Sequence, residues 1–268
     1  MAYVPRELPP ENVNVSPQHP LGEFVWLLGG LIGLLLGSFV LLGFAVDWIV
    51  PHVPPTTEQA LGQMFTSVYA KEQQGPSRDR LQQLLDRLSA RLPDKPVYQL
   101  HLVPEDTVNA MALPGGDIVI YTGLLAQAKS ENELALVLGH EIAHLHYRHS
   151  LRALGRALVL VTLSDLALGP NNGLSGLVYE TINGAQMRFS QDQESACDAL
   201  GLRLLVETYG HAGGATDFFS RLAAAKTLPE HLAYLDSHPH PAARVRQLQQ
   251  LIAAAGYRQG QLTPMHVD

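Results

Sequence analysis

The chain has little charge, a single cysteine and no excess of basic residues. Charged residues make up 16% of its 268 residues, and 18 Lys and Arg stand against 25 Asp and Glu, a formal net charge of −7. This balance argues against nucleic acid as a partner, because phosphate binding needs a basic surface. With Cys197 as the only cysteine, an internal disulfide and any site built from several thiolates are excluded.

Apolar residues are abundant by contrast. They make up 46% of the chain, enough for a folded core, which excludes a disordered protein. The length corresponds to one or two domains.

Part of the apolar content lies in one run near the N-terminus. Residues 24–46 contain no charged residue, and as a helix they would span about 34 Å, enough for a hydrocarbon core of about 30 Å. Trp26 and Trp48 stand near the two ends, where indole rings prefer the membrane interface. A cleaved signal peptide would have a basic start and a shorter apolar run. We therefore predict a retained single-pass anchor over residues 24–46, preceded by an N-terminal tail over residues 1–23.

The charges that flank this run suggest its orientation in the membrane, and its glycines suggest pairing with a second copy of the helix. Arg6 precedes the run, whereas no Lys or Arg follows it before Lys71, so the positive-inside rule puts the tail in the cytoplasm and the rest outside. In a bacterial inner membrane the domain would then be periplasmic. Gly29, Gly33 and Gly37 recur every fourth residue, a spacing that permits homo-oligomerisation through close helix pairing.

The rest of the chain has the pattern of a mostly helical α+β domain with a small β-sheet. Three prolines predict a stiff linker within a membrane-proximal segment over residues 47–75, before a domain over residues 76–262. Ser130 and Glu133 predict a capping box that opens a long helix. Apolar spacing, alternation and turn residues predict helices over 81–92, 131–149, 191–209 and 242–255 and strands over 97–103 and 117–121.

The capped helix carries the motif HExxH. His140, Glu141 and His144 lie within an arc of about 100° on one helix face. Two imidazoles one turn apart can both bind a zinc ion, and the glutamate can accept a proton from zinc-bound water. The alternative, a polar helix face with hydrogen-bonded histidines, must explain why Leu138 and Ile142 flank the motif.

A catalytic zinc needs a third protein ligand and an open position. Glu194 is the candidate, with Asp198 four residues later on the same helical face. Asp198 could then accept the second N–H of a ligand histidine. The alternative is that both carboxylates form a solvated helix face.

Four sequence segments, in this order along the chain, form a more specific pattern than HExxH alone. The segments NAMALPGGDIVIYTGLL, GHEIAHLHYRHS, QDQESACDALGLRLL and SHPHPAARVRQL resemble the zinc metalloendopeptidase family of the HtpX heat-shock protease, the CAAX prenyl endoprotease and the Oma/BepA-type quality-control proteases. The resemblance implies His140, His144 and Glu194 as ligands of one zinc per chain, Glu141 as the catalytic base and Asp198 as a carboxylate behind the ligands. Gln191 and Cys197 depart from the family pattern, which commonly has Arg and Ala there.

The resemblance also implies roles outside the ligand set. It places Asn109, Ala110, Met111 and Ala112 on an edge strand beside which an extended peptide could bind; the alternative is an ordinary turn before a core strand. It places His238 at the cleft, either stabilising the oxyanion or occupying the fourth position of zinc and holding the enzyme latent. The alternative is that His238 is a surface residue at the start of a helix, with no role in catalysis. Arg244 is expected to anchor this loop to a carboxylate.

Together these features predict a membrane-anchored zinc endopeptidase with Glu141 as general base, acting on unfolded or membrane-associated polypeptides in quality control of misfolded envelope or membrane proteins. The partners expected are polypeptide and the lipid bilayer, with no nucleic acid. The competing hypothesis is a chaperone or binding module with a structural zinc. Residues 158–168 are apolar but too short to span a membrane, so they form either a core helix or a flap at the membrane. For His149 we expect packing or support of a ligand rather than a second metal.

Overall fold

The computed structural model describes residues 19–183, 189–224, 233–238 and 241–265. They form helices, two 3₁₀ segments and three short strands, as the α+β prediction requires. The elements are α1 (Pro20–Ile49), η1 (Val50–His52), α2 (Pro55–Gly62), η2 (Gln63–Tyr69), α3 (Pro76–Ser89), β1 (Gln99–Val103), β2 (Ala110–Leu113), β3 (Asp117–Tyr121), α4 (Thr122–Gln127), α5 (Glu131–His146), α6 (His149–Leu168), α7 (Gly173–Asn183), α8 (Gln191–Tyr209), α9 (Asp217–Ala224), α10 (Tyr234–Ser237) and α11 (Pro241–Ala255).

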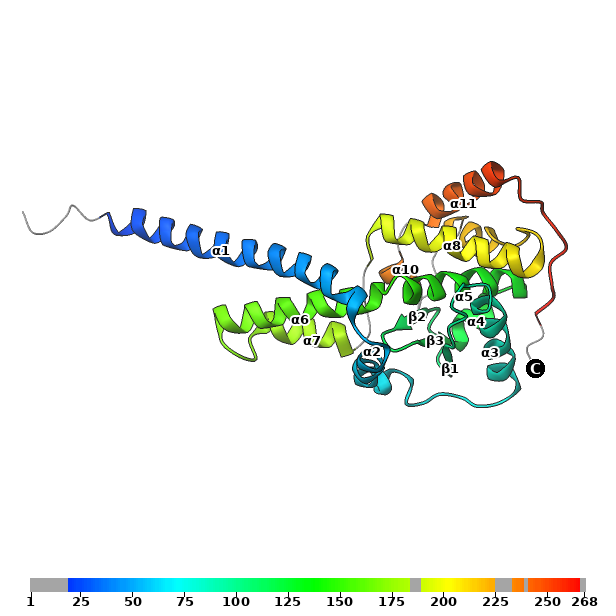
Figure 1. Ribbon diagram of the computed structural model, residues 1–268, viewed down its shortest axis with the longest axis horizontal. Helices are drawn as coiled ribbons and strands as arrows, with labels where there is room; N and C mark the ends of the chain where they lie inside the picture. The colour runs from blue at the N-terminus through cyan, green and yellow to red at the C-terminus, as the bar shows by residue number, and fades with distance from the viewer. Residues whose placement is uncertain (1–18, 184–188, 225–232, 239–240, 266–268) are drawn as a thin grey trace, which may run out of the picture.

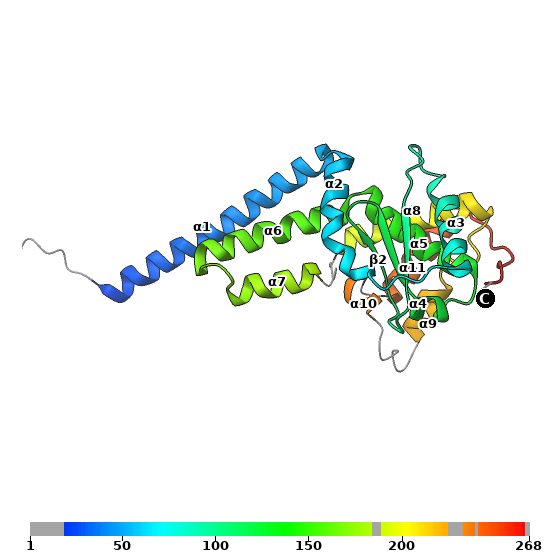
Figure 2. The ribbon, with the colours of Figure 1, turned by 90° about the horizontal axis from the view of Figure 1, so that it is seen from below.

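Helix α1 projects from the domain, and the α6–α7 hairpin leaves the domain on the same side (Figures 1 and 2). No residue of α1 is buried. The helical stretch Pro20–His52 is long and apolar enough to cross a membrane. Arg6, on which the predicted orientation depends, lies outside the described residues.

The sheet has the order β1-β3-β2. Strand β1 pairs with β3 in parallel, and β2 pairs with β3 antiparallel. The predicted strand over 117–121 has the bounds of β3, whereas β1 begins two residues later than predicted. Strand β2 lies at one edge of this sheet, where the family resemblance placed its residues.

Helices α5 and α8 cross in close contact in the core. A Cβ atom at Gly139 would lie 3.0 Å from the Cα of Gly201, and one at Gly201 would lie 2.9 Å from the backbone nitrogen of His140. The second distance is shorter than real Cβ contacts and the first is at the tight limit, so the two glycines allow the backbones to meet. Because Glu194, Asp198 and Gly201 recur at i, i+4 and i+7, the same face of α8 turns its two carboxylates toward His140.

The start and end of α5 differ in detail from the prediction. The Ser130 hydroxyl accepts the Glu133 N–H, so the N-cap is confirmed. The reciprocal bond of a capping box is not formed, because the Glu133 carboxylate accepts the Lys129 N–H and binds Arg221 of α9. The helix ends at His146 instead of 149, where Arg148 adopts a left-handed backbone with φ of 55°.

Arg148 joins the end of α5 to the chain that follows α1. Its guanidinium donates to the carbonyls of Val50 at 2.7 Å and Val53 at 2.9 Å. Beyond these residues, Phe65 packs against Val103 and Leu113 in a small second core. The membrane-proximal segment is therefore attached both to the sheet and to the helix that carries HExxH.

Candidate metal centre

The structure brings His140, His144, Glu194 and His238 together, and all four are buried. Helix α5 supplies the first two, the first turn of α8 supplies Glu194, and His238 follows α10. Each side chain offers one ligand atom, and these atoms all lie within 4.8 Å of one another. The three predicted ligands and one predicted catalytic histidine therefore share one cluster.

The spacing of these atoms suits ligands that share one metal ion. The Nε2 atoms of His140 and His144 lie 3.1 Å apart, and each is 3.4 Å from a Glu194 oxygen. His238 Nδ1 lies 3.2 Å from His140 Nε2 and 3.0 Å from Glu194 Oε1. A tetrahedral metal bound at about 2.0–2.1 Å separates its ligands by roughly 3.3 Å. The donor set and its geometry therefore fit zinc.

Asp198 and Arg244 lie directly behind the ligand His140. Asp198 Oδ1 accepts from His140 Nδ1 at 2.9 Å, which leaves Nε2 directed at the ligand cluster. Arg244 donates Nε to Asp198 Oδ2 at 2.9 Å and Nη2 to Oδ1 at 2.5 Å. Its guanidinium also stacks on the Phe219 ring, 3.9 Å from the centroid. Arg244 thus binds a carboxylate, in line with its expected anchoring role.

Electrostatics favour a cation at the cluster. Although burial opposes ionisation, His140 and the other histidines lower the pKa of Glu194, and Arg244 lowers the pKa of Asp198 to about 2. Burial holds the pKa of His144 well below its ordinary value, with His140 and His238 adding to the effect. Burial and Arg244 act against a charged His140, yet the carboxylates of Glu194 and Asp198 raise its pKa to about 9. The ionised Glu194 and the neutral His144 have the protonation states that metal ligands need, whereas His140 must release its Nε2 proton when a metal binds.

Glu141 lies beside the cluster with its carboxylate unpaired. The residue is 1% exposed, and neither oxygen has a hydrogen-bond partner among the described residues. The His238 Nε2 atom lies 3.6 Å from Oε1. A buried carboxylate without partners costs free energy, so this orphaned group needs a ligand such as water or metal beside it.

Two aromatic residues that the sequence did not single out enclose the site. The Tyr234 ring stacks on His238 with centroids 4.5 Å apart and is fully buried. The Phe189 ring lies 3.9 Å from that of His144. Tyr234 stands four residues before His238, a helical spacing that could have suggested the contact, whereas nothing near Phe189 in sequence indicates its position.

His149, at the start of α6, supports the second ligand histidine. Its Nδ1 lies 3.2 Å from His144 Nδ1, on the ring side opposite the ligand cluster, and 3.5 Å from Cys197 Sγ. Burial lowers the pKa of His149 to about 4, so its Nδ1 is available to accept the His144 N–H. Cys197 is fully buried, and burial raises the pKa of its thiol. His146 is exposed and takes no part.

The residues of the expected edge strand lie at β2, with Asn109 just before it. The Asn109 carbonyl accepts the Tyr121 N–H, so alternation along an antiparallel pair turns the polar groups of Ala110 and Ala112 away from β3. The Ala112 carbonyl accordingly accepts from Ser150 of α6, and the Ala110 N–H donates to the Asn109 side chain. Met111 is half-buried.

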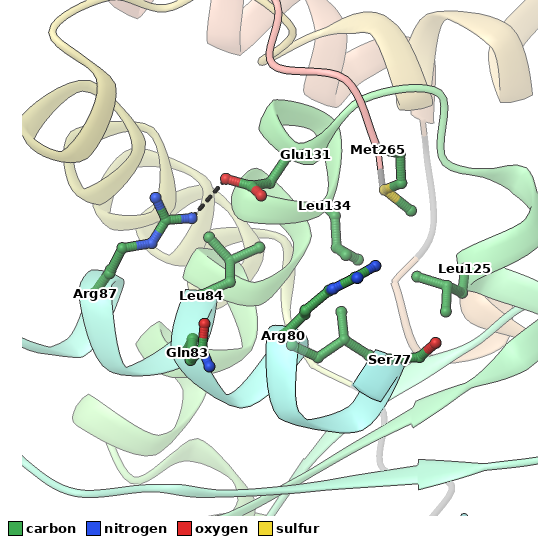
Figure 3. A pocket seen from close by; sticks show the side chains of 10 residues that line it. Ser77, Arg80, Gln83, Leu84, Arg87, Leu125, Glu131, Leu134 and Met265 are labelled. Carbon is green, nitrogen blue, oxygen red and sulfur yellow. Dashed lines mark hydrogen bonds and ion pairs between the residues drawn. The ribbon is translucent and has the colours of Figure 1, made fainter. Parts of the chain in front are cut away.

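Of two pockets in the described part of the domain, one reaches the cluster. The first, of about 430 Å³, lies between α3 and the start of α5, where Arg87 binds Glu131 (Figure 3). None of the predicted site residues lines it. The second, also of about 430 Å³, is lined by Glu194, Asp198 and Arg244. The second pocket therefore adjoins the candidate metal centre.

Comparison with known proteins agrees with this geometry. The family model described as Peptidase family M48 matches residues 73–252. The chain is 32% identical to the mitochondrial metalloendopeptidase OMA1 of Schizosaccharomyces pombe over 162 residues, covering 59% of this chain and 48% of the relative. It is 30% identical to the beta-barrel assembly-enhancing protease of Yersinia pestis, covering 55% and 33%, and 28% identical to that of Escherichia coli, covering 70% and 41%. The chain thus spans between about a third and a half of these relatives.

Proposed function

The chain belongs to peptidase family M48, and from this premise we propose that it is a membrane-anchored zinc endopeptidase acting in quality control of misfolded envelope or membrane proteins. Its relatives are named as a metalloendopeptidase and as beta-barrel assembly-enhancing proteases, which supports peptide-bond hydrolysis. The observation that carries the proposal is the buried cluster of four ligand residues beside the Glu141 carboxylate, whose oxygens accept no hydrogen bond from the described residues.

His140, His144 and Glu194 are the residues that would hold one zinc ion. Bound there, zinc would polarise a water molecule and the scissile carbonyl as a Lewis acid. Asp198 fixes the tautomer and orientation of His140 by accepting its Nδ1–H, and Arg244 holds Asp198 in place. Such outer contacts raise the basicity of a ligand imidazole and keep it directed at the metal.

Glu141 is the general base of the proposed reaction. Its buried oxygens accept no hydrogen bond from another described group, so their lone pairs are available to accept the proton of the attacking water. The same carboxyl then gives this proton to the leaving amine as the peptide bond breaks. A site that held zinc only for structure would have no need of such a carboxylate.

His238 is proposed to hold the enzyme latent. Its Nδ1 lies 3.2 Å from His140 Nε2 and 3.0 Å from Glu194 Oε1, which is where a fourth ligand would stand. An oxyanion stabiliser would have to leave this position open to a water molecule. The contacts therefore favour His238 as the fourth ligand, a plug of the metal site, over His238 as an oxyanion stabiliser. Removal of the ring from the ligand set would then be the activating step.

Substrate is proposed to bind as an extended strand along β2. The outward polar groups of Ala110 and Ala112 face away from β3, as an added strand requires. Ser150 occupies the Ala112 carbonyl, so an incoming N–H would replace the serine hydroxyl. Pairing through the main chain is largely independent of side chains, which suits a protease for unfolded segments.

The test is digestion of unfolded casein by the full chain in detergent, with zinc content measured in parallel. Glu141→Gln should abolish cleavage while zinc stays near one per chain. Glu131→Gln makes the same change in the first turn of the same helix and should leave both unchanged. A wild-type chain that binds zinc and unfolded protein without cutting it would favour the alternative, a chaperone module with a structural zinc.

A further inference from the structure

The α6–α7 hairpin exposes large apolar side chains although it belongs to a folded domain. Leu166 is 79% exposed and Leu168 is 67% exposed, near the tip of the hairpin. On α7, Leu177 is 61% exposed. Several large apolar side chains exposed on one hairpin of a folded chain are typical of a contact with a protein partner or a membrane.

Ion pairs join the first turns of α6, at the base of the hairpin, to the C-terminal end of α1. Arg156 of α6 binds Asp47 of α1 at 2.6 Å, and Arg152 lies 3.7 Å from the same carboxylate. Between these charges, the backbone of Gly155 packs so closely on α1 that a Cβ there would lie 2.8 Å from Val46 Cγ1. The apolar parts of α1 and α6 therefore start at one common level.

Beyond that level both elements are nearly free of charge. On α1, residues 24–46 carry no charged side chain, and on the hairpin, Asp165 is the one charged residue over 157–179. Residues 157–168 extend about 18 Å as a helix. This is roughly half of a hydrocarbon core of about 30 Å. The hairpin is thus long enough for one leaflet.

The Asn172 side chain at the tip forms all its hydrogen bonds within the hairpin. The Asn172 amide donates to Asp165 Oδ1 at 3.0 Å and to the Gly169 carbonyl at 2.9 Å. Its carbonyl oxygen accepts the N–H groups of Leu174 and Ser175. These bonds form an N-cap of α7, and they leave the Asn172 side chain paired within the hairpin, as a turn in hydrocarbon requires.

The hydroxyl groups of α6 follow the same rule. Thr162 donates to the Leu158 carbonyl at 2.8 Å, and Ser164 donates to the Val161 carbonyl at 2.9 Å. Hydroxyls that bond their own helix are compatible with an apolar environment.

We propose that the α6–α7 hairpin is a second membrane element, inserted into one leaflet beside α1 with the exposed leucines facing lipid. The occupant of this surface is the bilayer, because the apolar surface starts level with that of α1 and continues along it. The proposal goes beyond the proposed activity, but it rests on the proposed α1 anchor. One consequence is positional: α6 begins at His149, which contacts His144, so the catalytic centre would be held next to the membrane surface.

The test uses the full chain in phosphatidylcholine–phosphatidylglycerol vesicles, with an environment-sensitive fluorophore on single introduced cysteines. Leu166→Cys probes the hairpin, Leu36→Cys on α1 probes the anchor, and Val97→Cys in the domain is the control. Val97 is 80% exposed, matched to Leu166 at 79%. Cys197 is fully buried, so the parent chain should take up no label.

The proposal predicts that doxyl-labelled lipid quenches the labels at 36 and 166, while aqueous iodide quenches only the label at 97. Lipid quenching at 36 with iodide quenching at 166 would overturn the hairpin and leave the anchor intact. A label at 166 shielded from both quenchers would indicate a second copy of the chain on this surface, which also overturns it. Absence of lipid quenching at 36 and 166 would overturn both anchor and hairpin.

Discussion

The peptidase domain and the projecting part of the molecule, α1 with the α6–α7 hairpin, both depart from the usual distribution of residues. The domain buries charged residues, and the projecting part exposes apolar ones. In the domain, ionisable side chains such as Glu141, Glu194 and Arg244 are at most 4% exposed. In the projecting part, Trp26 and Leu166 are 83% and 79% exposed. Buried charge and exposed apolar surface both cost free energy unless a partner compensates them. Asp198 compensates Arg244, and we propose that a bound metal compensates Glu194 and that lipid covers the exposed apolar surface.

The largest effect is expected from removing a ligand. His144→Ala should reduce zinc content to near zero and cleavage by about a thousandfold or more, because only binding and positioning would remain. His146→Ala removes an exposed histidine of the same helix and should change neither quantity. Zinc analysis and casein digestion measure both. A fully active His144→Ala chain would show that the buried histidines do not serve a metal.

The second-largest effect is expected at His238, where the direction of the change in cleavage rate distinguishes a metal plug from an oxyanion stabiliser. His238→Ala should raise basal cleavage by about tenfold, the ratio that corresponds to about 1.4 kcal/mol of stabilisation of the plugged state. An oxyanion stabiliser would give a decrease instead. Initial rates at saturating substrate measure the sign, with His211→Ala as the control. An unchanged rate would exclude both roles.

A smaller effect is expected at the sheet edge. Ala112→Pro removes an N–H that faces away from β3 and should raise KM by about fivefold, the equivalent of one hydrogen bond of about 1 kcal/mol. Zinc content should not change. Ala112→Ser keeps the N–H and serves as the control. If KM is the same in both variants, substrate does not pair with β2.

The smallest effect concerns the sheet itself, outside the metal centre. Although burial disfavours the charged ring, Asp117 and Glu72 raise the pKa of His101 above 6.5. A raised pKa stabilises the fold fully below pH 6.5 and ceases to do so as the pH rises through the folded value. Because the ring is half-buried, the contribution should stay below about 1 kcal/mol.

Melting temperatures of the detergent-solubilised chain measure this contribution. His101→Gln should lower the melting temperature at about pH 6 and less so at about pH 9, since the neutral ring contributes less. His146→Gln should show no such pH dependence. An effect of His101→Gln that grows with pH would contradict the sign.

Local spacing predicted the parts of the molecule that depend on one helix. HExxH identified His140 and His144, and α8 has the bounds expected from its sequence. Contacts between distant segments were beyond that reasoning. The Gly139–Gly201 crossing brings the two helices together, yet neither glycine indicates it alone. Glu133 leaves the predicted capping box because Arg221, 88 residues later, binds it.

The metal site can be examined most directly by zinc X-ray absorption on the purified, detergent-solubilised full chain. The account predicts one zinc per chain with nitrogen and oxygen ligands at about 2.0–2.1 Å, including three imidazoles, and no sulfur. His144, His149 and Cys197 form a second cluster able to hold a metal. A sulfur ligand at about 2.3 Å would place the zinc there and contradict the account, as would a purified chain that binds no zinc.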